Sequence, residues 1–428
     1  MSDKTLQRLP LALAALLTCL SAHADFTSED GRARLSGFGT VGAARTNSDD
    51  ALFNYPGQGG GVDKQIGMEP DTKVGIQGSY KFTDSISGTA QLLTKYRAEG
   101  QYKPEFEWAF AKWQATPGLA IRVGRIGAPF FMVSDFRDVG YANTMVRPNL
   151  DVYGQVPVSS VNGGDISYQM SLGETVLTTT LWGGYSRADY ASALRSTTQA
   201  GTSSVDPVTI RLSKQMGLNL QAEFEGGYSV RLGHMQGRLS IDSSGINTTI
   251  ASAYAASPTV LGPRVQDALL TSDTKASFTG VGFTVDRDNI VVASEYTMRR
   301  IKKGAVADTT GWYLMGGYRF GSVLPYLSFS KLSVDEVNVP TSTAGLPQLL
   351  AAGVRASQST QYQAQRTTSV GVRWDALRNA AVKLQFDHIK KPANSNGLFL
   401  VENPVTDTAF QQSKKNINVI SLAVDFVF

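Results

Sequence analysis

The feature that most constrains this chain is the alternation of short and long connections between its expected strands. Sixteen stretches between residues 32 and 428 alternate apolar and polar side chains, the pattern of a β-strand with two different faces. Because tight turns and longer loops join them in strict alternation, we expect an antiparallel sheet with all its long loops at one end. The expected strands are 32–46, 72–82, 86–97, 106–115, 119–125, 164–171, 175–187, 216–224, 228–238, 276–286, 290–302, 310–320, 323–333, 366–376, 380–391 and 416–428.

The connections themselves have the composition of turns and loops. The short ones are rich in Gly, Asn and Asp, which tolerate positive φ: 83–85, 116–118, 172–174, 225–227, 287–289, 321–322 and 377–379. The long ones are 47–71, 98–105, 126–163, 188–215, 239–275, 303–309, 334–365 and 392–415. A soluble β-sandwich has no reason to gather its long loops at one end. An outer-membrane barrel does, with tight periplasmic turns and long outer loops.

Composition and the first residues agree with an exported membrane barrel. Charged residues make up 18% of the 428, below the usual share of about 25%. A single cysteine and three histidines argue against a disulfide scaffold and a zinc site. Residues 1–24 resemble a secretory signal, with Lys4 and Arg8 before the apolar run 9–20 and an Ala-x-Ala cleavage site after it. We expect 1–24 to be removed and 25–428 to form one domain.

The alternation also predicts which side chains face lipid. In 416–428, Leu422 and Val424 lie on the apolar face, whereas Ser421 and Asp425 lie on the polar one. A water-filled barrel turns its apolar face outward and its polar face inward. Aromatic residues near strand ends are expected to form interfacial girdles: Tyr80, Phe82, Trp108, Phe320, Phe426 and Phe428.

With these features the chain resembles the Gram-negative outer-membrane porins over residues 25–428, including an alternating last strand with terminal Phe428. The resemblance implies an all-β fold, a 16-stranded antiparallel transmembrane β-barrel in the outer membrane. It also implies a passive diffusion channel for small hydrophilic solutes, neither an enzyme nor a nucleic-acid binder, with no cofactor or metal. The implied partners are the lipid bilayer, lipopolysaccharide, the outer-membrane assembly machinery and two further copies in a homotrimer.

In porins the loop after the fifth strand folds into the lumen as a constriction. Here 126–163 follows the fifth expected strand, so the resemblance implies that this loop lies in the bore. The candidate pore-lining residues are Lys95, Arg122, Asp135, Arg137, Asp138, Arg147, Asp151 and Arg373.

Alternation also predicts the charge on the lumen wall. The ten basic residues expected to face inward are Lys73, Lys81, Lys95, Arg97, Arg122, Arg231, Arg299, Arg319, Arg373 and Lys383. The six acidic ones are Glu107, Asp165, Glu223, Glu295, Asp375 and Asp387. Because rings of charge select ions by sign, this excess predicts a weak preference for anions.

Three alternatives remain open at this stage. The first is a substrate-specific channel. The second is an outer-membrane hydrolase, which needs a serine activated by a histidine; Ser277 could lie opposite His234 on the neighbouring strand. The third is a structural barrel with a plugged lumen, distinguished from a channel by packed side chains in place of an open, charged bore.

Overall fold

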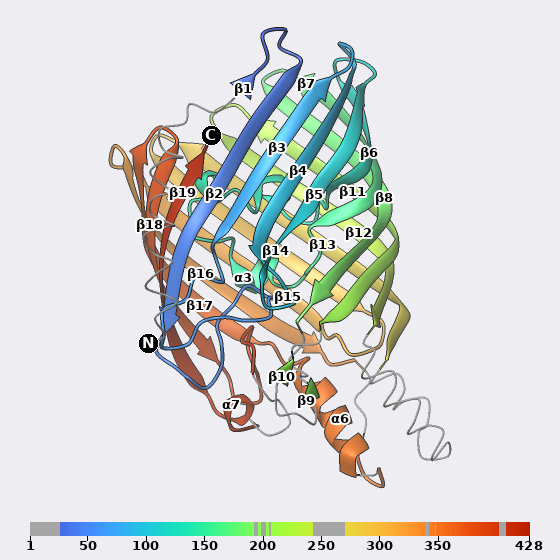
Figure 1. Cartoon of the computed structure of the whole chain (residues 1–428), viewed down its shortest axis with the longest axis vertical. Helices are drawn as coiled ribbons and strands as arrows, with labels where there is room; N and C mark the ends of the chain where they lie inside the picture. Colours follow the sequence, from blue (N-terminus) through green and yellow to red (C-terminus); the bar gives the residue numbers. More distant parts are fainter. Residues whose placement is uncertain are drawn as a thin grey trace.

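The computed structural model describes residues 26–191, 196–197, 203–204, 207–242, 270–338, 342–346, 348–401 and 408–428. Figure 1 shows a single antiparallel sheet rolled into a barrel, with helices α6 (Gln348–Ser359) and α7 (Thr408–Gln412) at one end of it. The expected signal segment 1–24 lies outside the described residues.

The sixteen expected strands are all present, and they close into a barrel because the last long strand pairs with the first. The strands are β2 (Ala33–Thr46), β3 (Lys73–Lys81), β4 (Ile86–Tyr96), β5 (Tyr102–Gln114), β6 (Leu119–Gly127), β7 (Ser160–Leu172), β8 (Thr175–Tyr190), β11 (Val208–Phe224), β12 (Tyr228–Asp242), β13 (Thr271–Arg287), β14 (Ile290–Ile301), β15 (Asp308–Tyr318), β16 (Val323–Glu336), β17 (Gln365–Leu377), β18 (Ala380–Lys391) and β19 (Lys415–Val427). The two-residue strand β1 (Phe26–Thr27) adds to β2, and β9 (Ser196–Thr197) pairs with β10 (Ser203–Ser204) outside the barrel sheet.

Several strands reach further toward the long-loop end than expected, because local irregularities interrupt the alternation. β11 begins eight residues before the expected 216, and its register shifts near Lys214, whose φ is 50°. Asp273, with a φ of 44°, lies at the corresponding end of β13. Such bulges exchange the two faces of a strand. The alternation of apolar and polar residues therefore ends at the bulge, and the predicted strands end there too.

β5 also starts earlier than expected, at Tyr102, and contains Pro104. It pairs with β4 along its length, but its pairing with β6 covers only Ala109–Gln114. Proline, which cannot donate a ladder hydrogen bond, is tolerated where a strand has a neighbour on one side only. A register shift near Gln91 also turns Trp108 toward the inside, so the prediction that Trp108 belongs to an interfacial girdle is wrong.

The barrel has an apolar outer surface and a polar or loop-covered inner one. Leu422 is 48% exposed, whereas its neighbours Ser421 and Asp425 are fully buried against the interior. Tyr80, Phe82 and Phe320 are likewise exposed on the outside. Closure removes free backbone edges, which is what allows a sheet to cross a bilayer. Among the described helices, none is long and apolar enough to do so.

Two adjacent residues on β3 lie at nearly the same depth in the membrane but on opposite faces of the sheet, so substitutions there test which face meets lipid. Ile76 is 48% exposed on the lipid side, and Gln77 points inward. We expect Ile76→Arg to lower the free energy of unfolding by about 2–4 kcal/mol near the midplane, because a charge then faces hydrocarbon. Gln77→Arg should cost far less. Equal losses for both variants in denaturant titrations of the refolded barrel would contradict this assignment of faces.

The closing seam between β2 and β19 is held by complementary shapes and by a buried hydrogen bond. The rings of Phe426 and Phe428 lie against Gly39 and Gly37, leaving no room for a Cβ at either glycine. On the inner side, the Thr40 hydroxyl donates to Asp425 at 2.5 Å. The seam is therefore register-specific, because a slip of one residue would place a side chain under each ring.

Candidate functional site

The interior of the barrel is occupied by the 32 residues between β6 and β7, 128–159, which we call the inner loop. It contains three short helical segments, η1 (Ser134–Phe136), η2 (Gly140–Ala142) and α3 (Leu150–Tyr153). η2 packs against β2 and β19, and α3 packs against β14, β15, β16 and β17. The inner loop therefore reaches the wall opposite the strands from which it starts, and Figure 1 shows α3 within the barrel outline.

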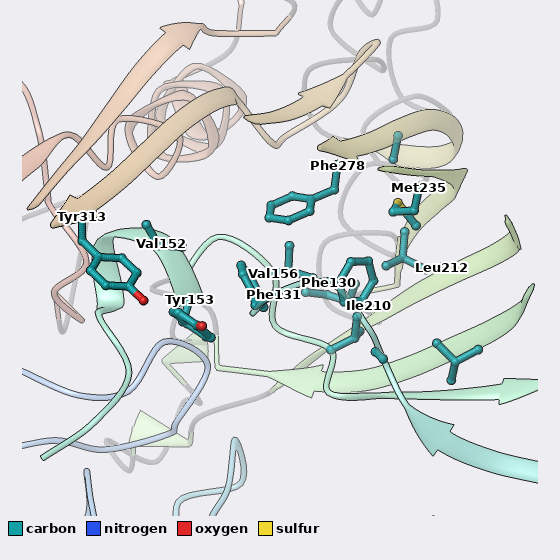
Figure 2. Close-up of a cluster of buried hydrophobic side chains, with 14 of the residues drawn as sticks. Phe130, Phe131, Val152, Tyr153, Val156, Ile210, Leu212, Met235, Phe278 and Tyr313 are labelled. Atoms are coloured by element: carbon teal, nitrogen blue, oxygen red, sulfur yellow. The ribbon is translucent and has the colours of Figure 1, made fainter. Parts of the chain in front are cut away.

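An aromatic cluster fixes the beginning of the inner loop. Phe130 meets Trp182 and Phe278 edge-on, with ring centroids 5.6 and 5.8 Å apart. Phe131 stacks on Tyr153 at 4.4 Å and meets Phe278 at 5.2 Å. Figure 2 shows the rings of Phe130, Phe131, Tyr153 and Phe278 together with Ile210, Leu212 and Met235, which point from the wall toward them. On this side the inward positions are thus apolar and packed rather than polar and wet.

Two basic residues of the far wall hold the middle of the inner loop through its backbone. The Lys383 ammonium is fully buried, donates to the carbonyls of Gly140 (2.7 Å), Asn143 (2.6 Å) and Met145 (3.1 Å), and pairs with Asp425 at 2.8 Å. Arg373 donates to the carbonyl of Asn143 at 2.9 Å and to that of Tyr141 at 2.7 Å. Both charges are thus committed to the inner loop.

Arg147 makes the third polar attachment, from the inner loop outward. Its guanidinium donates to Asp71 at 2.8 and 2.5 Å, to Ser421 at 2.7 Å and to Asp387 at 3.3 Å. The side chain is 3% exposed. A charge removed from water in this way needs close partners, and here two carboxylates supply them.

Helix α3 is attached by carboxylate and amide groups. Asn149 caps the helix by accepting from the Asp151 N–H at 3.1 Å. The Asp151 carboxylate accepts from Ser330 at 2.7 Å, Gln365 at 2.6 Å and Thr367 at 3.3 Å. Burial raises the pKa of Asp151 to about 6, although these three donors act in the opposite direction.

The remaining charges of the inner loop face strands β3, β4 and β5. Asp138 lies between two lysines, 3.4 Å from the Lys73 ammonium and 3.0 Å from the Lys95 ammonium. Burial acts to raise the pKa of Asp138, but the two lysines outweigh it and hold that pKa below its usual range. Asp138 is therefore ionised at any physiological pH.

Next to this triad is a group of polar side chains with unused hydrogen-bonding capacity. Arg137 is 8% exposed and interacts electrostatically with Tyr55, Glu107 and Asp138. Glu107 Oε1 and the Tyr55 hydroxyl are buried and find no hydrogen-bond partner among the described residues. Buried polar atoms of this kind are normally satisfied. Each of the two has the capacity for a further hydrogen bond with water or a polar solute.

Arg122 and Asp135 complete the charged surface on this side. Arg122 binds Asp165 through both carboxylate oxygens, with its Nε at 3.1 and 2.9 Å. Asp135 is exposed on η1 and interacts electrostatically with Arg122 and with Arg231. We call this charged surface, between residues 135–138 of the inner loop and the wall of β3, β4, β5, β6 and β7, the charged gap.

Comparison with known proteins supports the fold. No protein-family model matches the chain, and no curated protein matches it in sequence. Among solved structures, the outer-membrane channel DcaP of Acinetobacter baumannii is similar with a TM-score of 0.53 at 10% identity, covering 95% of this chain and 100% of that one. The chain has a porin fold.

Two further structures support the same fold. Salmonella typhi OmpF, solved with daunomycin, has a TM-score of 0.53 at 13% identity, covering 94% of this chain and 99% of its own. An anion-selective porin from Comamonas acidovorans has a TM-score of 0.52 at 11% identity, covering 92% and 99%. At such low sequence identity, the structural similarity supports the shared barrel architecture alone. The details of the site rest on this chain's own contacts.

Within this porin fold, the structure separates the eight candidate pore-lining residues into two groups. Five of them border the charged gap: Lys95, Arg122, Asp135, Arg137 and Asp138. The other three lie where the inner loop meets the far wall: Arg147 and Asp151, which are buried, and Arg373, which is partly buried. Two further residues at these sites, Asp71 and Tyr55 from loop 47–71, are not among the predicted pore-lining residues. No local pattern marks them, because their partners are far away in sequence.

The serine–histidine pair of the hydrolase alternative does not form. His234 lies opposite Thr279 in the ladder, and its Nδ1 is 2.8 Å from the Thr279 hydroxyl oxygen. Ser277 lies opposite Gln236 instead. Within the described ranges there is also no group of three histidine, cysteine or acidic side chains arranged to hold a metal ion.

Proposed function

We propose that this protein is an outer-membrane channel through which small hydrophilic solutes diffuse passively, and that it has no enzymatic activity. The observation that carries the proposal is the charged gap, where unsatisfied buried polar atoms and facing charges border one side of the inner loop inside a lipid-facing barrel. A homotrimer in contact with lipopolysaccharide is part of the proposal, as in porins generally. Single-channel recording in planar bilayers tests the proposed channel function. If the protein produces no discrete conductance steps, the proposal is wrong and the lumen is plugged.

The proposed location and orientation can be tested by labelling. Ser342 and Asn394 are exposed in long loops, whereas Asp84 and Asp288 are exposed in tight turns. We expect Ser342→Cys and Asn394→Cys to react with an impermeant maleimide on intact cells, and Asp84→Cys and Asp288→Cys to react only after lysis. The one native cysteine, Cys19, lies in the expected signal segment. Labelling of the turn variants from outside would overturn the orientation.

We propose that ion selectivity is weak. The charged residues that interact with one another in the charged gap are four basic and four acidic ones: Lys73, Lys95, Arg122, Arg137, Glu107, Asp135, Asp138 and Asp165. The basic excess expected along the whole wall includes Arg373 and Lys383, which are committed to the inner loop. Any anion preference should therefore be smaller than a count of wall charges suggests.

Two opposite substitutions test which residues set that selectivity. Asp138→Asn releases Lys73 and Lys95 and should move the reversal potential in a salt gradient toward anion selectivity. Lys95→Gln should move it toward cation selectivity. The exposed pair Asp49–Lys64 offers a control, because Asp49→Asn in an outer loop should leave the potential unchanged. Shifts of the same sign for Asp138→Asn and Lys95→Gln would exclude the charged gap as the selective region.

A further inference from the structure

Three basic side chains lie in a row across the neighbouring strands β16, β17 and β18 (Figure 1), close to the strand ends that carry the long loops. Lys331 lies directly opposite Arg366 in the ladder, and Arg366 lies directly opposite Lys390. Residues in such positions have Cβ atoms about 4.5–5.5 Å apart, and like charges there destabilise a sheet. We call these three residues the basic row. Its mutual repulsion needs an explanation.

The basic row faces outward, at the third of three levels that cross the outer surface of β17, β18 and β19. The first level, deepest in the membrane, is apolar and exposed: Val370, Phe386 and Ile420. The second is polar: Thr368, His388 and Asn418. The third contains Arg366 and Lys390, both exposed. Because alternate residues of a strand share a face, successive levels are about 7 Å apart. Their order is that of a lipid monolayer, from hydrocarbon to charged headgroup.

Other basic residues on the outer face at this end of the barrel have acidic partners. Those of β11, β12 and β14 form three pairs: Arg211–Asp242 (2.9 Å), Arg238–Asp273 (3.5 Å) and Arg300–Asp335 (2.9 Å). Within the part of the chain that the structure describes, no carboxylate pairs with a member of the basic row. Asp335 is on β16 itself, but it is bound to Arg300. The positive charge of the basic row is therefore left for a partner outside the barrel.

We propose that the basic row binds the phosphate groups of a phosphorylated lipid in the outer leaflet, with the acyl chains along the apolar level below it. This inference rests on the proposed contact with lipopolysaccharide and assigns that contact to one side of the barrel. A phosphate between two opposite members of the row accepts hydrogen bonds from both and replaces their repulsion with attraction. Arg366 is the central residue, because it neighbours both lysines and its guanidinium can offer two N–H groups to one phosphate.

Native mass spectrometry of the full-length barrel in dodecyl maltoside, with diphosphorylated lipid A as the probe, tests the basic row. We expect the triple variant Lys331→Gln/Arg366→Gln/Lys390→Gln to bind lipid A at least about tenfold more weakly than the wild type. A matched control removes the same charge from the same end of the barrel at the three paired arginines: Arg211→Gln/Arg238→Gln/Arg300→Gln. It should weaken binding by less than about twofold. Equal losses in the two variants would overturn the proposal, because net charge alone would then hold the lipid.

Two further probes distinguish lipid phosphate from its separate parts. Lipid A without its phosphates should bind to the wild type no better than to the triple variant of the basic row. Inorganic phosphate at the same concentration should not displace lipid A, because it makes no contact with the two lower levels. Displacement by inorganic phosphate, or unchanged binding of the dephosphorylated lipid, would refute the site. Binding in detergent does not require conduction, so a barrel that conducts no ions would disprove the channel and leave this test intact.

Arg366→Gln adds a test in which the sign of the effect changes. Without lipid A, this variant should unfold at a higher denaturant concentration than the wild type, because the repulsion of Lys331 and Lys390 by residue 366 is gone. With lipid A in excess, the wild type should be the more stable of the two, because a ligand stabilises the state that binds it. Arg366→Lys keeps the charge and should follow the wild type in both conditions. An Arg366→Gln barrel that is less stable than the wild type in both conditions would contradict the proposal.

Discussion

Lys383→Met is expected to lower the free energy of unfolding by about 3–5 kcal/mol, because it leaves the buried Asp425 carboxylate without its cation. It also removes the donor shared by the carbonyls of Gly140, Asn143 and Met145. The inner loop should then lose its hold on the far wall, and the channel should show a higher and noisier conductance. Denaturant titration and single-channel recording measure the two effects.

Matched variants separate the ion pair from a general loss of charge. Lys81→Met removes an exposed lysine at the short-turn end of β3 and should change the free energy of unfolding by no more than about 0.5 kcal/mol. Adding Asp425→Asn to Lys383→Met should recover part of the lost stability, since no unpaired charge then remains buried. If the double variant is less stable than Lys383→Met, the ion pair is not the source of the loss.

Phe131→Ala is the second change with a large expected effect. Phe131 is 2% exposed and lies between the rings of Tyr153 and Phe278. Truncation should lower the free energy of unfolding by about 3–5 kcal/mol, because the surrounding rings cannot fully close the space that the Phe131 ring leaves behind. Phe136→Ala is the control on the same loop: Phe136 is 39% exposed, so its loss should cost about 0.5 kcal/mol or less. Similar losses for both would mean that the aromatic cluster does not anchor the inner loop.

The strand pattern was predictable because strand period and turn chemistry are local properties. The inward positions of β11, β12 and β13 were not, because residues such as Met235 and Phe278 pack on the inner loop rather than face water. Alternation alone assigns every inward position to the lumen. Alternation therefore cannot distinguish inward side chains that line an open passage from inward side chains that pack against the inner loop.

The polar contacts of the inner loop could not be predicted from local sequence patterns, because they join residues that are far apart in the chain. Arg147 meets Asp71 across 76 positions, Asp387 across 240 and Ser421 across 274. Arg373 was assigned correctly to the inner face, but its backbone partners could not be read from its own strand. The pattern therefore predicts that all inward charges contribute to ion selectivity, although several of them bind and hold the inner loop.

The seam between β2 and β19 bears on the order in which the barrel forms. Its buried hydrogen bond joins Thr40 to Asp425, 385 positions apart, so the two strands meet only after nearly the whole described chain has been made. Contacts of such long range form slowly, and until then the two edge strands carry unpaired backbone groups that hydrocarbon does not tolerate. The glycine–aromatic fit of Gly37 and Gly39 therefore favours the correct pairing over a shifted one when the two edges finally meet, since only that pairing leaves room for the rings of Phe428 and Phe426.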